Sequence, residues 1–357
     1  MKAIGILTTG NDGTFVDEFE LDPPGPGEVL VELRASGVCH TDWDVKRNAK
    51  DILVMGHEGA GVALEIGAGV TRVSPGDAVA LNWAVPCGKC FQCARGGHSV
   101  CENKPEVPRE RTRHRGVGIR RAFRLGTMAT HTVVREEACV RIEGKIPFAS
   151  ASILGCGVMT GVGSALNAAR VEFGSIAVVL GCGGVGLNCI QGARIAGAAR
   201  VIAVDVNPER LAMATLFGAT ETILADRADE GLSAAAAKVR EATSGRGADY
   251  AFECTAIPEL GAAPLAMIRN GGVAVQASGI ERVIPFPMEL FEWNKAYINP
   301  LYGLCVPDRD FPRLFELYHA RQLLLDEMVT RTYTIHELDG AFEDMRAGRN
   351  AKGVILL

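Results

Sequence analysis

The sequence predicts an α/β fold in which a β-rich domain is joined to a doubly wound parallel-sheet domain. Two patterns support this fold. The first part of the chain reads as short strands separated by glycine and proline turns, and from about residue 158 apolar strand-like runs alternate with alanine-rich helix-like runs. The chain has 357 residues, 48% of them hydrophobic and 22% charged, which suits a globular protein with two substantial cores.

The β-rich prediction starts from residues 28–34, where Val29, Val31 and Leu33 share one face of an alternating pattern. A turn-forming stretch of proline and glycine at 23–27 precedes this strand. Residues 62–79 continue as short strands, with turns at 67–69 and 74–77. We therefore expect a β-rich domain in this part of the chain.

The parallel-sheet prediction rests on apolar runs at 176–180, 200–204, 222–224, 250–253 and 272–275. Helix-like segments, such as 233–242, lie between them. The sheet pattern stops near residue 301, and a helix at 311–317 and an apolar end at 353–357 follow. We predict one domain from 1–157 with 302–357, and a second domain from 158–301.

A glycine-rich turn follows the first strand of the second domain. The chain passes from the strand at 176–180 into a helix-like segment through the pattern G-x-G-x-x-G. Such a turn directs unpaired backbone N–H groups and the positive end of a helix at a pyrophosphate. Outside this strand–turn–helix context the pattern would be only a glycine-rich loop. The predicted cofactor-binding residues of the turn are Gly181, Gly183, Gly184, Val185 and Gly186.

Asp205 ends the second strand and predicts which dinucleotide binds. A carboxylate at this place accepts hydrogen bonds from ribose hydroxyls and repels a 2′-phosphate, which favours NAD over NADP. Arg210 lies nearby and is a candidate reader of a 2′-phosphate, but Asp205 occupies the position that usually discriminates. We expect NAD, with both residues at the cofactor site.

The chain has eleven cysteines, which metal binding explains better than disulfides when no secretion signal is visible. Four of them form the pattern C-x2-C-x2-C-x7-C and can close a tetrahedron around Zn²⁺ without an open position. The alternative is a redox C-x-x-C pair, which the third and fourth cysteines make less suitable. The predicted structural zinc ligands are Cys87, Cys90, Cys93 and Cys101.

Cys39, His57 and Cys156 are further candidate ligands, each in a glycine-flanked motif. Two thiolates and one imidazole would leave the fourth position of zinc open, as a catalytic site requires. The residues alone do not pair these three positions, because cysteine and histidine are often buried structural residues.

Motifs along the chain resemble the zinc-containing medium-chain alcohol dehydrogenases. The resemblance rests on the motifs at 37–42, 56–61, 76–77 and 155–157, the four-cysteine segment and the glycine-rich turn, which occur here in the order of that family. It covers essentially the whole chain. It implies a GroES-like catalytic domain that carries two zinc ions, a Rossmann domain that binds NAD, and an active site in the cleft between them.

The resemblance also implies roles for single residues. Cys39, His57 and Cys156 would hold the catalytic zinc, Asp42 would orient His57, and Glu58 would lie behind the metal. In the mechanism that the family uses, zinc lowers the pKa of the bound alcohol and hydride passes to the nicotinamide.

Thr41 matches the family's hydroxyl that hydrogen-bonds the substrate oxygen and starts a proton relay. The alternative is a hydroxyl that bonds local backbone. The implied cofactor contacts are Thr160, Val185 and Leu301 at the nicotinamide, and His40 and Lys352 at the pyrophosphate.

The chain departs from the family pattern at several places. Asp44 stands where the animal liver-type enzymes end the relay with a histidine, so this carboxylate or water would carry the proton out. The loop between Asp44 and Met55 is shorter than usual, which would open the substrate entrance. Trp83 replaces a smaller aromatic residue and either narrows the substrate pocket or packs in the core.

An unusually basic run extends from residue 109 to 124 in a chain whose net charge is −5. It reads either as a solvated surface loop or subunit contact, or as a clamp for an anionic substrate tail. The residues concerned are Arg109, Arg111, Arg113, His114, Arg115, Arg120, Arg121 and Arg124.

Together these features predict an oxidoreductase, a zinc-dependent alcohol dehydrogenase that oxidises a primary or bulky, aromatic alcohol with NAD⁺ in a reversible reaction. The alternatives are a dehydrogenase of a thiol–formaldehyde adduct and a non-catalytic protein that binds zinc and NAD. We expect a cytoplasmic homodimer or homotetramer with a small-molecule substrate and neither nucleic-acid nor membrane partners, because the charge is acidic and no run of about 18 apolar residues occurs.

Overall fold

The computed structural model describes residues 1–11, 13–280 and 282–357. The chain divides into two compact units, one comprising Met1–Cys156, Val306–Arg321 and Leu325–Leu357, the other Gly157–Cys305 and Gln322–Leu324. The domain limits given above stay a prediction, and each unit is described by itself.

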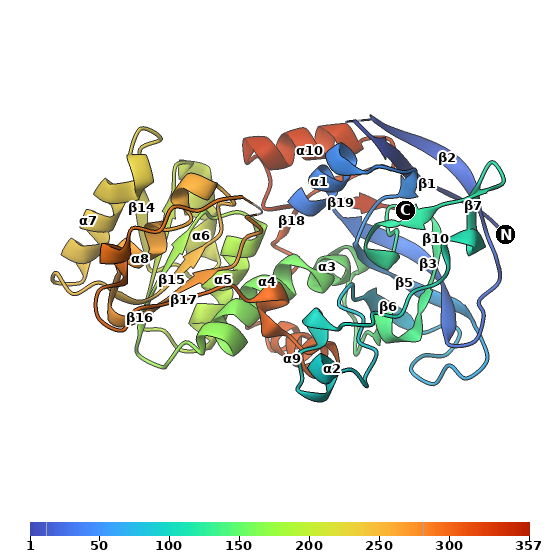
Figure 1. Ribbon diagram of the computed structural model, residues 1–357, viewed down its shortest axis with the longest axis horizontal. Helices are drawn as coiled ribbons and strands as arrows, with labels where there is room; N and C mark the ends of the chain where they lie inside the picture. Colours follow the sequence, from blue (N-terminus) through green and yellow to red (C-terminus); the bar gives the residue numbers. More distant parts are fainter. Residues whose placement is uncertain (12, 281) are drawn as a thin grey trace. The chain divides into compact units, whose positions relative to one another are not determined.

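The first unit is built on two sheets (Figure 1). One has the strand order β8-β7-β2-β1-β4-β9, and the other has the order β11-β6-β5-β3-β19-β18 with β10 also paired to β3. The strands are β1 (Lys2–Gly10), β2 (Gly13–Leu21), β3 (Glu28–Gly37), β4 (Leu53–Val54), β5 (Glu58–Ile66), β6 (Ala78–Leu81), β7 (Thr112–His114), β8 (Val117–Gly118), β9 (Arg120–Arg121), β10 (His131–Arg135), β11 (Cys139–Arg141), β18 (Val329–Tyr333) and β19 (Lys352–Leu356). The predicted β-rich domain is therefore present.

The register of β3 explains how this unit places candidate ligands together. β3 runs antiparallel to β5, with Gly37 opposite Glu58, so the end of one strand meets the start of the other. Cys39 lies two residues after the end of β3, and His57 directly precedes β5. The helices of this unit are α1 (His40–Asn48), α2 (Phe91–Ala94), α3 (Phe148–Ser152), α9 (Pro307–His319) and α10 (Leu338–Ala347).

The second unit contains one parallel sheet with the order β14-β13-β12-β15-β16-β17. The order grows outward from β12 in both directions, which confirms the predicted doubly wound sheet. Its strands are β12 (Ile176–Leu180), β13 (Arg200–Asp205), β14 (Glu221–Leu224), β15 (Ala248–Glu253), β16 (Ile268–Gln276) and β17 (Ala296–Ile298). Its helices are α4 (Gly157–Gly163), α5 (Gly184–Ile195), α6 (Pro208–Leu216), α7 (Ser233–Ala242) and α8 (Ala263–Met267) (Figure 1).

The core of this unit lies between its strands and helices. Val178, Ile202 and Ala251 of the sheet are fully buried and pack in one cluster with Val239 of α7 and Leu265 of α8. Strands buried on both faces read as continuous apolar runs, which is why the sequence revealed them. The reversal of strand order between β12 and β15 is the place where doubly wound sheets bind ligands.

Candidate metal centres and dinucleotide site

The four cysteines that follow β6 come together as predicted. The sulfur atoms of Cys87, Cys90, Cys93 and Cys101 all lie within 4.8 Å of one another. The backbone N–H of Cys93 donates to the sulfur of Cys90 at 3.4 Å, and that of Cys87 donates to the sulfur of Cys101 at 3.3 Å. The hydrogen bond from Cys93 is the main reason why the pKa of Cys90 falls to about 6. This closed set of sulfur donors fits Zn²⁺.

A second group of ligand atoms joins residues that are far apart in sequence. The ligand atoms of Cys39, His57, Glu58 and Cys156 also lie within 4.8 Å of one another. Cys156 reaches the group from the end of a short 3-10 helix, Ile153–Gly155, and the other three come from the junction of β3 and β5. The structure thus assembles the triad that sequence spacing left open.

Asp42 holds His57 in one orientation. Its Oδ1 lies 2.7 Å from Nδ1 of His57, and its Oδ2 accepts a hydrogen bond from the backbone N–H of Cys39 at 3.1 Å. Nε2 of His57 is buried and has no hydrogen-bond partner among the described residues. A buried imidazole nitrogen rarely stays unpaired unless a metal or another group completes it. The residues therefore fit a metal ion at Nε2.

The two sulfurs of this group shift each other's pKa in opposite directions. The neighbouring Cys156 lowers the pKa of Cys39 well below the usual value of a cysteine. Cys39 in turn raises the pKa of Cys156 well above that usual value. Two buried thiols cannot both ionise unless positive charge compensates them. A divalent cation between them supplies that charge, which is a second way in which this donor set fits a metal.

Glu58 and Lys352 form a buried ion pair beside the same group. Nζ of Lys352 lies 2.7 Å from Oε1 of Glu58, and both side chains are buried. Burial is the main reason why the pKa of Glu58 rises to about 7, although Lys352 opposes the shift. Lys352 thus has an intramolecular partner in the first unit, and its predicted contact with a pyrophosphate stays a prediction.

The predicted relay residues lie on α1. The sulfur of Cys39 donates to Oγ1 of Thr41 at 3.7 Å, which places this hydroxyl beside the ligand group. His40 and Asp44 are exposed on the same helix. Their predicted contacts with cofactor and proton stay predictions.

Aromatic side chains flank His57. The ring of Phe123 lies 4.9 Å from the His57 ring, and the Trp83 ring meets Phe123 edge-on at 5.7 Å, measured between centroids. Trp83 is half-buried and borders the ligand group through Phe123. Sequence reasoning missed Phe123, whose backbone is left-handed with φ of 50°. Its one sequence signal is an aromatic residue within the basic run.

The glycine-rich turn of the second unit has the shape that a dinucleotide requires. Gly181 has φ of 84°, and a Cβ at Gly186 would lie 1.9 Å from the carbonyl oxygen of Gly181. These positions therefore need glycine. α5 begins directly after Gly183, so its first N–H groups face the turn. The N–H groups at the start of α5 beside this turn fit a phosphate group.

Asp205 lies beside the turn. Its Oδ2 accepts a hydrogen bond from Cys182 N at 2.7 Å, its Oδ1 accepts one from Asn207 N at 2.9 Å, and Nη1 of Arg210 lies 4.0 Å from Oδ2. The parallel register of β12 and β13 brings strand ends 180 and 204 level, which sets this contact. Both predicted ribose-side residues are therefore together at the turn.

The predicted nicotinamide contacts lie in the same unit. Val185 is in the first turn of α5, and Thr160 is half-buried on α4. α4 packs on α5 and on the short helix that contains Leu301, whose side chain is exposed. The cofactor contact of each residue stays a prediction.

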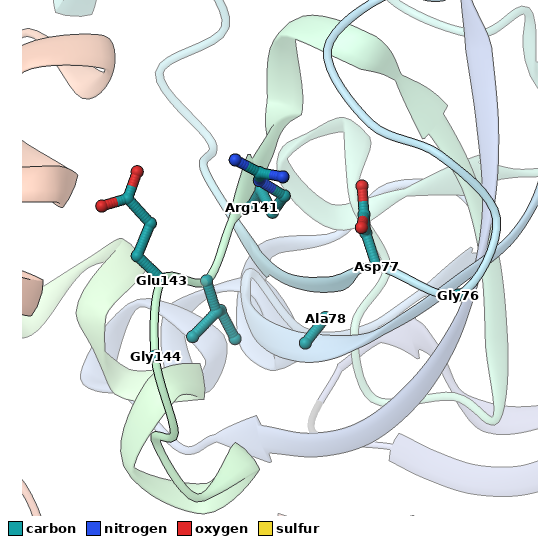
Figure 2. A pocket seen from close by; sticks show the side chains of 7 residues that line it. Gly76, Asp77, Ala78, Arg141, Glu143 and Gly144 are labelled. Carbon is teal, nitrogen blue, oxygen red and sulfur yellow. The ribbon is translucent and has the colours of Figure 1, made fainter.

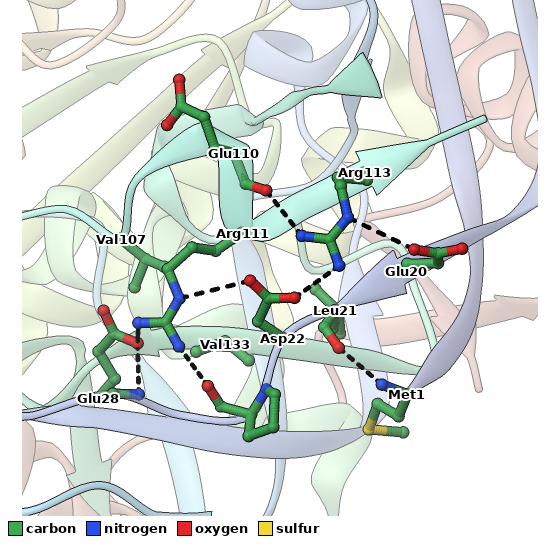
Figure 3. A network of polar contacts seen from close by, with 12 residues as sticks. Met1, Glu20, Leu21, Asp22, Glu28, Val107, Glu110, Arg111, Arg113 and Val133 are labelled. Carbon is green, nitrogen blue, oxygen red and sulfur yellow. Dashed lines mark hydrogen bonds and ion pairs between the residues drawn. The ribbon is translucent and has the colours of Figure 1, made fainter. Parts of the chain in front are cut away.

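Carboxylates neutralise most of the basic run. Arg111 pairs with Glu28 at 2.7 Å, and Arg113 pairs with Asp22 at 2.6 Å (Figure 3). Further ion pairs join His114 and Arg115 with Asp17, Arg120 with Asp51, Arg109 with Glu110 and Arg124 with Glu106. Arg121 is buried and donates to backbone carbonyls. For most residues of the basic run, these contacts favour a surface loop or subunit contact over a clamp for an anionic substrate.

A pocket of about 380 Å³ lies between the turn that precedes β6 and the segment that follows β11 (Figure 2). Its charged lining residues are Asp77, Arg141 and Glu143. None of the predicted site residues lines this pocket, so the candidate chemistry lies elsewhere.

No single helix in the part of the chain that the structure describes is long and apolar enough to cross a membrane. One bent pair, Phe148–Gly155 with Gly157–Ala169, meets the requirements of length and composition only when both parts are taken together.

Comparisons with known proteins agree with this geometry. A family model described as the alcohol dehydrogenase GroES-like domain matches residues 25–144, and one described as a zinc-binding dehydrogenase matches residues 184–319. The chain is 38% identical to "Putative alcohol dehydrogenase D" of Mycobacterium tuberculosis, which covers 95% of each chain. It is 37% identical to an "NDMA-dependent alcohol dehydrogenase" of Amycolatopsis methanolica, which covers 96% of this chain and 95% of that one.

A solved structure also resembles this one. The benzyl alcohol dehydrogenase of Acinetobacter calcoaceticus has a TM-score of 0.89 and 28% sequence identity, and the match covers 100% of this chain and 99% of that chain.

Proposed function

The chain belongs to the family of zinc-binding, GroES-like alcohol dehydrogenases, which confirms the resemblance, and we propose that it oxidises a primary or bulky aromatic alcohol with NAD⁺. The proposal includes two zinc ions in each chain, a zinc-carrying domain formed by residues 1–157 and 302–357, an NAD domain formed by residues 158–301, and a homodimer or homotetramer.

One observation carries the proposal more than any other. Cys39, His57 and Cys156 converge from distant parts of the chain, and the buried Nε2 of His57 lacks a partner within the described residues. Three ligands of this kind leave room for a substrate at zinc, whereas the four-cysteine site does not.

Residues of the chain would then position the metal ligand and transfer the proton of the alcohol. When bound, zinc lowers the pKa of an alcohol by acting as a Lewis acid, and NAD⁺ accepts a hydride. Asp42 lies at Nδ1 of His57 and would hold the proton on that nitrogen, which would leave Nε2 able to hold the metal. Thr41 would accept the alcohol proton in a hydrogen bond and pass it toward Asp44 or water.

The second unit would bind the cofactor. The N–H groups at the start of α5 would hold the pyrophosphate, and Asp205 would accept the ribose hydroxyls. Because Asp205 is buried and already accepts two backbone hydrogen bonds, its carboxylate is fixed in place. This arrangement supports NAD as the preferred cofactor, with Arg210 as a further contact of the same site.

The aromatic surface beside His57 supports the choice of alcohol. Phe123 and Trp83 present half-buried rings next to the ligand group, which suits an apolar or aromatic substrate body. The similarity to a benzyl alcohol dehydrogenase supports the same substrate class.

The test is NADH formation with benzyl alcohol by zinc-loaded protein. We expect turnover with NAD⁺ that Cys156→Ser abolishes. Because one relative is named NDMA-dependent, the assay is repeated with NDMA as acceptor. Turnover only of formaldehyde in the presence of a thiol would instead support the thiol-adduct alternative, and binding of zinc and NAD without any turnover would contradict an enzymatic role.

A further inference from the structure

A row of side chains leads from His57 to an ammonium group. Phe123 contacts His57, Trp83 contacts Phe123, and Nζ of Lys104 lies 5.2 Å from the centroid of the Trp83 ring. Phe123, Trp83 and Lys104 are all half-buried. An apolar surface thus extends from the candidate metal centre and ends at a cation.

Lys104 has no carboxylate partner in the described ranges, unlike the paired arginines of the basic run. Arg124, which follows Phe123 in the chain, lies close enough to add to the effect of burial in lowering the pKa of Lys104. Arg124 pairs with Glu106 at 3.2 Å, and the Glu106 side chain is 62% exposed. Lys104 contacts Trp83 and Arg124 follows Phe123 in the chain, so the two cations flank the contact between these rings, and of the two only Arg124 has a carboxylate partner among the described residues.

We propose that Lys104 and Arg124 form a subsite for the carboxylate of an alcohol substrate whose apolar body lies along Phe123 and Trp83. A carboxylate at this place would relieve the repulsion between two like charges and gain charge-assisted hydrogen bonds. The guanidinium of Arg124 suits a planar carboxylate, and the ammonium of Lys104 adds a point charge. This inference rests on the proposed function, because it names the substrate class of the same site.

A structural role for Lys104 is the competing explanation. Lys104 follows Cys101 by three residues, and the Cys101 sulfur raises the pKa of the ammonium, so its charge could serve to balance the thiolates of the four-cysteine site. In that case Lys104→Met would reduce zinc retention at that site and leave the preference for charged substrates unchanged.

The experiment compares three alcohols in the zinc-loaded protein: benzyl alcohol, 4-(hydroxymethyl)benzoate and its neutral methyl ester. The ester matches the size of the acid, so their ratio of kcat/KM isolates the charge. We expect the acid to be preferred, and Lys104→Met or Arg124→Gln to reduce the acid-to-ester ratio about tenfold, mainly through KM. Equilibrium binding of 4-(hydroxymethyl)benzoate, measured by calorimetry, should weaken by a similar factor.

Arg115→Gln is the matched control, because Arg115 belongs to the same basic run but is highly exposed and pairs with Asp17. It should leave both the ratio and the binding unchanged. An acid-to-ester ratio and calorimetric affinity that do not change in Lys104→Met and Arg124→Gln would overturn the subsite, as would an equal change in Arg115→Gln. Failure of the proposed function looks different, because all three alcohols would then remain unoxidised while calorimetry still reports on the subsite.

Discussion

The two cysteine-containing groups of the first unit differ in how the chain builds them. Cys87, Cys90, Cys93 and Cys101 lie within one short segment, and four sulfurs complete the group. Cys39, His57 and Cys156 come from separate elements, and the group includes a carboxylate and an unpaired imidazole nitrogen within the described residues. With zinc bound, the four sulfurs would leave no position for a substrate, whereas Cys39, His57 and Cys156 would leave one, since Glu58 is paired with Lys352.

The difference suggests that the four-cysteine group contributes to the stability of this unit and that the other group contributes to its chemistry. A closed site contributes its binding energy to folding, because the metal joins parts of one segment that have little core of their own. An open site is held by the fold, here by the register of β3 and β5 and by Asp42. Substitutions in the open group should therefore reduce activity with little change in stability, whereas substitutions in the closed group should mainly reduce stability.

The largest effect is expected at the open group, which consists of Cys39, His57 and Cys156. Cys156→Ser should lower kcat/KM for benzyl alcohol by more than about 100-fold, because loss of the metal removes several kcal/mol of transition-state stabilisation. About one zinc per chain should be lost, with little change in Tm. Elemental analysis, steady-state kinetics and thermal unfolding measure these three quantities. Unchanged turnover would rule out Cys156 as a ligand.

In the closed group, which consists of Cys87, Cys90, Cys93 and Cys101, a substitution should mainly affect stability. Cys93→Ser should lose the zinc of the four-cysteine site and destabilise the fold, by roughly 3 kcal/mol or a Tm decrease of about 6–12 °C. The measurement is thermal unfolding with zinc analysis. Full stability together with full zinc content would show that these cysteines do not bind metal.

A change beside the open group sharpens the comparison. Asp42→Asn removes the charge that orients His57 and should reduce zinc affinity at the open group or activity by about 10–100-fold. Zinc competition with a chelator measures the affinity of each site. Equal weakening of both zinc sites would mean that Asp42 acts through general stability.

The smallest effect concerns the second unit. Asp205→Gly should reduce the preference for NAD over NADP by about tenfold, because it removes the carboxylate that repels a 2′-phosphate. Some loss of stability accompanies it, since Cys182 N and Asn207 N lose their acceptor. Kinetics with both cofactors give the ratio, while zinc content serves as the control. An unchanged ratio would mean that Asp205 does not select the cofactor.

The sequence predicted those elements and sites that depend on residues close together in the chain. The strand at 176–180 and the helix at 233–242 appear with the predicted bounds, because apolar runs and alanine-rich runs are local signals. The four-cysteine group was predicted from spacing alone for the same reason.

Features that depend on distant partners were not predictable in this way. The triad needed the family resemblance, since no spacing connects residue 39 with residue 156. The carboxylates that neutralise Arg111 and Arg113 are Glu28 at the start of β3 and Asp22 just after β2, far from the basic run in sequence. Phe123 was missed because its contact with His57 joins distant parts of the chain, and an aromatic residue within the basic run does not by itself indicate that contact.

The most direct test of the two-site account is X-ray absorption at the zinc edge of Cys156→Ser protein. The account predicts that the zinc which remains has four sulfur neighbours at about 2.3 Å and no nitrogen or oxygen neighbour. Remaining zinc with a histidine nitrogen in its coordination, or loss of zinc from the sulfur site, would contradict the assignment of closed and open groups.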